Sequence, residues 1–128
     1  MKRTVINTPL APQPVGPYSQ AIAATGTMIF VAGQIPLSAA GELVGGDDIV
    51  AQTKQVMQNL GEILKAAGAD YRNVVRVGVF LSDINDFAAM NDVYAQYFDS
   101  ATAPARAAVE VAKLPKGVRV EIDCIAVV

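Results

Sequence analysis

Apolar residues recur at spacings of three and four in two stretches of the chain, which is the pattern of an amphipathic helix. The first stretch runs from Asp47 to Ala67, where Asp47 or Asp48 would cap the start and Gly68 suits the end. Its apolar face consists of Ile49, Thr53, Val56, Met57, Leu60, Ile63, Leu64 and Ala67. The second stretch covers 86–98, with a stripe made of Phe87, Met90, Tyr94, Tyr97 and Phe98. We therefore predict two helices, each with one face toward a core.

Six further stretches have the β-branched, aromatic or alternating residues that are typical of strands. They cover residues 4–7, 18–25, 28–36, 73–83, 106–112 and 118–128. The segment 8–17 contains four prolines and a glycine and is predicted to be a loop, while a turn at 25–27 and a tight link at 113–117 join successive strands. This order predicts a single α+β domain over residues 1–128, with two helices on one face of a mixed, mainly antiparallel sheet.

The last predicted strand has two different faces. Alternate residues on one face are all apolar or small: Val118, Val120, Ile122, Cys124 and Ala126. The other face is half charged and half apolar, with Arg119, Glu121, Asp123, Ile125 and Val127. The first face should lie beneath the helices. In a two-layer fold the second face has nothing of its own chain to cover it, so a partner subunit is the expected cover.

The composition narrows the available chemistry. The chain has no histidine and one cysteine, which removes Ser-His-Asp and Cys-His pairs and the common zinc sites. Its net charge is −2 and its cations form no run, so nucleic acid is not an expected partner. No apolar run is long enough for a signal peptide or a membrane span. We expect a soluble, cytoplasmic protein that uses carboxylates, tyrosine, lysine or the backbone for acid–base work.

Two charged residues are the main candidates for chemistry. Arg106 stands among small residues with no acid within three positions, and a guanidinium offers two parallel donors that match a carboxylate. The alternatives are a surface residue or one half of an ion pair between subunits. Glu121 lies on a partly apolar strand face, where it could act as a base or hold a water. The alternative without a function is that Glu121, Arg119 and Asp123 form an exposed row of charged side chains on alternate positions of the strand.

Other residues are weaker candidates. Tyr18 begins a strand, so its hydroxyl could bind a ligand while its ring packs. Gly33 permits a close approach of a ligand or of another backbone segment. The glycine could instead mark a β-bulge. Asn91 lies beside the aromatic stripe of the second helix, and either solvent or a hydrogen bond could satisfy it. Cys124 falls on the apolar face and is interpreted as a core thiol without a catalytic role.

Several blocks of the sequence together resemble the Rid family, the reactive intermediate deaminases also known as YjgF-type proteins. The blocks are "GPYSQAI", "VAGQIPL", "ILKAAGAD", "VFLSDINDFAAMNDVY" and "APARAAVEVAKLPKGVRVEID", and they occur in this order over nearly the whole chain. The resemblance implies a chorismate-mutase-like fold. It also implies a homotrimer with the sheets toward the centre, the helices outward and three sites in the clefts between subunits.

The resemblance further implies the activity of a 2-iminobutanoate/2-iminopropanoate deaminase. Such an enzyme hydrolyses imine or enamine acids, for example those derived from 2-aminoacrylate, to 2-keto acids and ammonia without a cofactor. Carried over by position, Arg106 would grip the substrate carboxylate and Glu121 would hold or activate the attacking water. Tyr18 would line the pocket, Gly33 would let main-chain groups approach the substrate, and Asn91 would be a pocket-side residue.

This chain departs from the family pattern at two positions in the expected pocket. Ala108 stands where the family often has a cysteine, and Ala32 stands where it often has a serine or threonine. The first change removes a reactive thiol and the second removes a hydroxyl that could help to hold a ligand. Neither change removes the arginine or the glutamate, so we expect altered affinity or substrate range.

Two other functions remain open at this point. A non-catalytic sensor of keto acids or other small carboxylic acids would use the same Arg106. An RNA-cleaving activity, as claimed for some relatives, is disfavoured by the acidic isoelectric point near 4.9 and the scattered cations.

Overall fold

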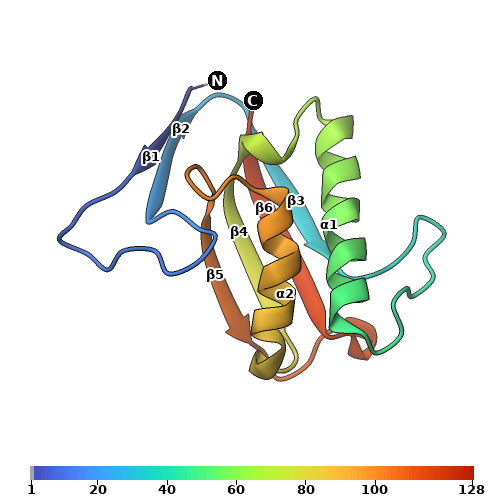
Figure 1. Ribbon diagram of the computed structural model, residues 1–128. Helices are drawn as coiled ribbons and strands as arrows, with labels where there is room; N and C mark the ends of the chain where they lie inside the picture. Colours follow the sequence, from blue (N-terminus) through green and yellow to red (C-terminus); the bar gives the residue numbers. More distant parts are fainter. Residues whose placement is uncertain (1) are drawn as a thin grey trace.

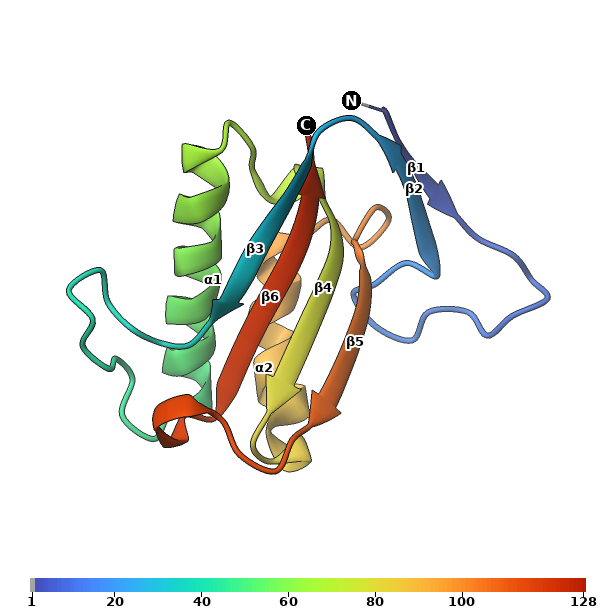
Figure 2. The ribbon, with the colours of Figure 1, turned by 180° about the vertical axis from the view of Figure 1, so that it is seen from behind.

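The computed structural model describes residues 2–128 as two helices packed on one face of a four-stranded sheet, with a separate two-stranded hairpin beside them (Figure 1). The strand order in the large sheet is β3-β6-β4-β5, and only the β4–β5 pair is parallel. Seen from behind, no helix covers the second face of this sheet (Figure 2). The predicted α+β class is confirmed. The bounds are β1 Lys2–Ile6, β2 Ala21–Thr25, β3 Met28–Gln34, α1 Ile49–Ala66, β4 Val74–Leu81, α2 Phe87–Tyr94, β5 Ala105–Glu110 and β6 Val120–Val127.

The core lies between the helices and the sheet, as the alternation in the last strand predicts. Val120, Ile122, Cys124 and Ala126 of β6 are buried, and the intervening residues are partly exposed. Burial raises the pKa of the Cys124 thiol to about 12, so the thiol stays protonated and unreactive at neutral pH. This supports its interpretation as a core residue. Neither helix in residues 2–128 is long and apolar enough to cross a membrane.

Asp48 is the residue that caps helix α1. Its carboxylate accepts the backbone N–H groups of Val50 and Ala51, at 2.9 and 3.4 Å. Those donors have no partner inside the helix, because the first turn of a helix has no preceding carbonyls. The neighbouring Asp47 instead forms an ion pair with Arg119.

We expect Asp48→Ala to lower the free energy of unfolding by about 1 kcal/mol, the usual cost of losing an N-cap. Urea unfolding followed by circular dichroism measures the change. Asp48→Asn is the matched control, because an asparagine carbonyl accepts the same bonds, and it should leave the stability nearly unchanged. Equal losses in the two variants would show that charge rather than capping matters at this position.

The segment between β2 and β3 does not form the hairpin turn that was predicted at 25–27. Strand β2 pairs with β1 and does not pair with β3, so the two strands belong to different sheets. Gly26 lies at the crossing with φ of 139°, a conformation that favours glycine, and a Cβ there would collide with the carbonyl of Val128. Thr27 then pairs with Val128 through two backbone hydrogen bonds. The segment therefore redirects the chain instead of closing a hairpin.

Arg119 also lies differently from its predicted place on the open face of the last strand. It precedes the start of β6, so the strand pleat does not hold its side chain. Its guanidinium reaches Asp47 and Asp86, both at 2.9 Å, near the first turns of the two helices. Arg119 thus connects the two helices and does not contribute to the open face.

Candidate functional site

Arg106 lies on β5, the edge strand of the large sheet, and points toward the helix side. Its partner on β4 is Val77, a core residue that is 1% exposed. Paired residues of neighbouring strands share a face, so the guanidinium lies at the edge of the layer that α2 occupies. Ala108 pairs with the buried Val79 and therefore shares this face.

An amide and three aromatic rings surround the guanidinium of Arg106. Nη1 donates to Oδ1 of Asn91 on α2 at 2.6 Å. The guanidinium carbon lies 4.7 Å from the ring centre of Tyr94, 5.5 Å from that of Phe87 and 5.7 Å from that of Tyr18. Aromatic faces attract a cation without neutralising it. Tyr18, Asn91, Ala108 and Arg106, which the sequence analysis selected separately, therefore come together.

The charge of Arg106 has no carboxylate partner within the described residues. The ion pairs there involve Arg72 and Arg119, and the hydrogen bonds of the Arg106 side chain use Nη1 alone. Partial burial lowers the pKa of this guanidinium, since a charge loses hydration there. The group stays charged, because its usual pKa is far above neutral. A partly buried cation with unused donors is suited to binding an anion.

Phe87 and Tyr94 are the residues that the sequence analysis treated only as packing. Their spacing from Asn91, four residues before and three after, places all three on one face of α2. This helical spacing was the feature of the sequence from which their place beside Asn91 could have been predicted. The hydroxyl of Tyr94 is buried and has no hydrogen-bond partner, and burial raises its pKa, so it stays protonated.

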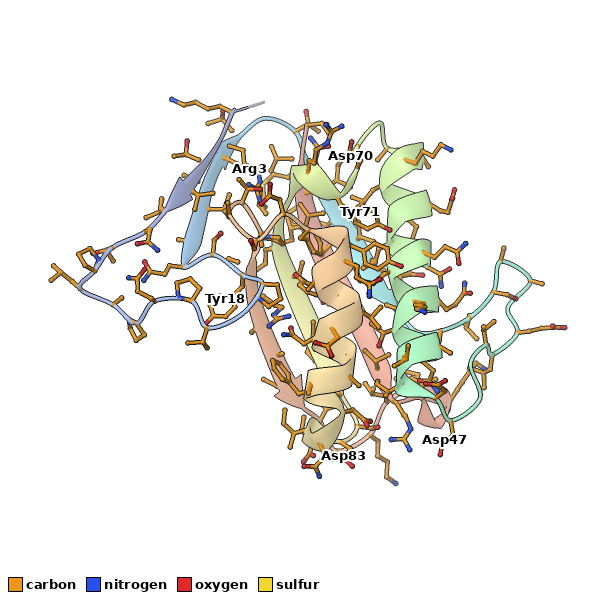
Figure 3. All side chains as sticks on the ribbon, in the orientation of Figure 1. Arg3, Tyr18, Asp47, Asp70, Tyr71 and Asp83 are labelled. Carbon is orange, nitrogen blue, oxygen red and sulfur yellow. The ribbon has the colours of Figure 1, made fainter. Side chains whose placement is uncertain are left out.

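The loop before β2 holds Tyr18 in place. Ser19 donates from its backbone N–H to the carbonyl of Pro104 at 3.3 Å and from its hydroxyl to the carbonyl of Ala103. Gln20 bonds to both N–H and C=O of Thr8, which closes the proline-rich loop. Figure 3 shows Tyr18 on this segment, on the side of the molecule where β5 and α2 lie.

Glu121 and Gly33 form a second group on the open face of the sheet. Glu121 of β6 pairs with Phe80 of β4, whose side chain is only partly buried. A Cβ on Gly33 would collide with the Glu121 carboxylate, so the glycine leaves room for the acid. The register of β3 shifts between Val31 and Gln34, so Gly33 lies within a bulge. Ala32 precedes it in the same bulge and is exposed.

The two groups do not meet within one chain. Strand β4 separates β5 from β6, so Arg106 and Glu121 are on the order of 10 Å apart across the sheet. They also differ by three positions along β4, since their partners there are Val77 and Phe80. Their side chains point to opposite faces. A site that uses both residues needs them from different copies of the chain.

The surface hollows of the single chain are consistent with a site that one chain alone does not complete. One hollow of about 630 Å³ lies beside α1 and is lined by Lys54, Gln58, Gly61, Glu62, Lys65, Ala69, Asp70, Tyr71 and Tyr97. None of the predicted site residues lines this hollow, and another of about 260 Å³ includes Tyr18 but neither Arg106 nor Glu121. Within residues 2–128, no group of three or more histidine, cysteine, aspartate or glutamate side chains is arranged to hold a metal ion.

Comparison with known proteins identifies similar chains over the full length. Residues 8–128 match the family model described as endoribonuclease L-PSP. A 2-iminobutanoate/2-iminopropanoate deaminase of Capra hircus is 56% identical over 98% of this chain and 90% of its own. A RutC family protein of Synechocystis sp. is also 56% identical, over 99% of this chain and 98% of its own.

Solved structures match the fold as well as the sequence. A Rid protein of unknown function from Yersinia pestis superposes with a TM-score of 0.92 at 33% identity, with both chains covered completely. The E. coli protein TdcF, crystallised with bound serine, superposes with a TM-score of 0.72 at 41% identity over 98% of each chain. These structures have the chorismate-mutase-like fold of Rid proteins, which confirms the expected architecture.

Proposed function

Because this chain belongs to the Rid family, also called the YjgF or endoribonuclease L-PSP family, we propose that it is a deaminase of small 2-imino acids. It would hydrolyse substrates such as 2-iminopropanoate, 2-iminobutanoate and their enamine forms to 2-keto acids and ammonia. The observation that carries the proposal is the guanidinium of Arg106, a partly buried cation with free donors and no carboxylate partner among the described residues. An imino acid supplies that carboxylate.

The reaction needs positioning and one proton-transfer group. Arg106 holds the substrate carboxylate through two parallel hydrogen bonds, while Asn91 fixes the guanidinium from its other side. Glu121 holds a water near the C=N carbon and takes a proton as the water adds. The Glu121 carboxyl returns this proton to the imine nitrogen, which gives a neutral carbinolamine. The hydroxyl proton of the carbinolamine then passes to the nitrogen, the C–N bond breaks and ammonia leaves as the carbonyl forms. No cofactor or covalent nucleophile takes part.

The aromatic rings set the size of the substrate. Phe87, Tyr94 and Tyr18 surround the guanidinium, so a carboxylate bound there has apolar walls close to it. Short aliphatic imino acids suit such a space. The bound serine of TdcF is a small amino acid of the same general shape, which supports this substrate class. Ala108, which replaces a larger side chain, leaves additional room beside Arg106.

The site is proposed to lie between subunits of a homotrimer. Glu121 and Gly33 of one copy would face Arg106, Asn91 and Tyr18 of the next. The opposite orientation of the two groups in one chain supports this, as does an uncovered sheet face that includes the exposed Phe30 and Val109. Light scattering that gives a monomer mass at micromolar concentration would contradict the proposal. The lone, buried Cys124 fits the cytoplasm, where we place this activity.

The activity can be measured by competition for a trapped intermediate. An amino-acid oxidase generates an imino acid, semicarbazide traps it, and the protein should divert the flux to keto acid and ammonia. Diversion should rise with protein concentration and persist in the presence of a metal chelator. If the wild-type protein diverts nothing, the deaminase proposal fails. Binding of keto acids without turnover, unchanged in Glu121→Gln, would favour a sensor instead.

RNA cleavage is not the function that we propose, despite the description of the family model. The chain has a net charge of −2, and phosphate binding normally needs clustered cations. RNA binding that weakens steeply with added salt would reverse this conclusion.

A further inference from the structure

Within residues 2–128 the outer strands β1, β2, β3 and β5 each have one free edge, and of these only β2 and β3 contain no charged residue. In this part of the chain β2 pairs only with β1, and β3 pairs only with β6. Neither strand contains a charge or a proline, since their sequences are AIAAT and MIFVAGQ. Natural proteins usually protect free edges with lysine, proline or a bulge. The bulge of β3 begins only after Val31, so Met28–Val31 is unprotected.

The two edges cannot meet within one chain in this arrangement. The hairpin formed by β1 and β2 is held on the β4–β5 side of the sheet. Arg3 donates to the carbonyls of Val74 and Thr102 at 2.9 and 2.7 Å, and Ser19 bonds to Ala103 and Pro104. Strand β3 is the edge farthest from β5 (Figure 2). Its Met28 and Phe30 remain 54% and 71% exposed.

We propose that β2 of one copy pairs antiparallel with β3 of a second copy, so that each subunit adds its N-terminal hairpin, residues 2–25, to its neighbour's sheet. The pairing satisfies both edges at once and buries exposed apolar residues such as Phe30. It is a head-to-tail contact, in which different surfaces of the two copies meet, and such a contact forms a closed ring, here the proposed trimer, when its rotation closes. The inference rests on the trimer under Proposed function and names the segment that joins its subunits.

This exchange also explains how a shared site would be completed. The hairpin keeps Tyr18 against Arg106 of its own chain, at 5.7 Å. The same hairpin would contact the neighbour's β3, the strand that carries Gly33 beside Glu121. The pairing of β2 with β3 therefore links the Arg106 half of one subunit to the Glu121 half of the next.

Disulfide trapping between chains tests the pairing. Three variants, Ile22→Cys, Ala23→Cys and Ala24→Cys, scan the register along β2. Each is mixed with Phe30→Cys, and the pair is dissociated in urea, refolded together and mildly oxidised. At least one mixture should give a disulfide-linked dimer on a non-reducing gel. With random mixing of equal amounts, about a quarter of the contacts between β2 and β3 contain both cysteines, which limits the yield. The native Cys124 is 3% exposed and should not react.

The matched control is Leu10→Cys, a 94% exposed position in the loop of the same hairpin, which should not cross-link to Phe30→Cys. Absence of a cross-link in all three mixtures would overturn the exchange. So would a disulfide that forms only within one chain of a variant carrying both cysteines. Light scattering and the deaminase assay on the same samples separate this outcome from a failure of the trimer or of the activity.

Discussion

Arg106→Ala is expected to lower kcat/KM for imino-acid hydrolysis by about 100-fold or more. The variant loses two charge-assisted hydrogen bonds to the substrate carboxylate, together worth roughly 3 kcal/mol or more, and each 1.4 kcal/mol is a factor of about ten. The loss should be in kcat as well as in KM, because the carboxylate also aligns the C=N carbon with the water. The trapping assay with an amino-acid oxidase measures it.

Two variants isolate the role of the guanidinium in this result. Arg72→Ala removes an arginine that is exposed and paired with Asp70 on the surface, and it should leave the activity unchanged. Arg106→Lys keeps the charge but loses the forked geometry, so it should recover only part of the activity. If Arg106→Ala diverts imino acid as well as the wild type, the arginine is not the carboxylate clamp and the proposed mechanism fails.

Mixing two inactive variants is expected to restore activity. Arg106→Ala and Glu121→Gln should each be inactive as pure proteins. After they are refolded together, some sites combine an intact arginine from one subunit with an intact glutamate from another. Random mixing of equal amounts places both residues in about a quarter of the sites, which sets the upper limit of recovery. The positions of Arg106 and Glu121 on opposite faces of one chain are the reason for this expectation.

The control for this experiment is a mixture of Arg106→Ala with the double variant Arg106→Ala/Glu121→Gln, which has no intact arginine and should stay inactive. A site built within one chain would give no recovery in either mixture, because neither single variant contains both residues. Recovery in the first mixture alone therefore distinguishes a shared site from a local one.

Local pattern in the sequence was sufficient for the elements and for the core. Residues spaced by three and four predicted both helices, and the alternation through Ile122 and Cys124 predicted which face of β6 is buried. These results follow from the helix and strand periods, which depend only on neighbouring residues. The sequence context likewise indicated Arg106, a cation with no acid within three positions, and Glu121, an acid on a partly apolar strand face.

Strand order and the position of the hairpin were decided only by the tertiary structure. The period of a strand does not specify its neighbour, so the sequence did not reveal that β4 separates β5 from β6 or that β2 leaves β3. For the same reason it placed Arg106 and Glu121 in one candidate site without showing that they face opposite sides. The rings of Phe87 and Tyr94 acquire a role only when α2 packs against β5, a contact between residues distant in the chain. The sequence alone determined the candidate residues and their local faces, and long-range pairing decided which of them can meet.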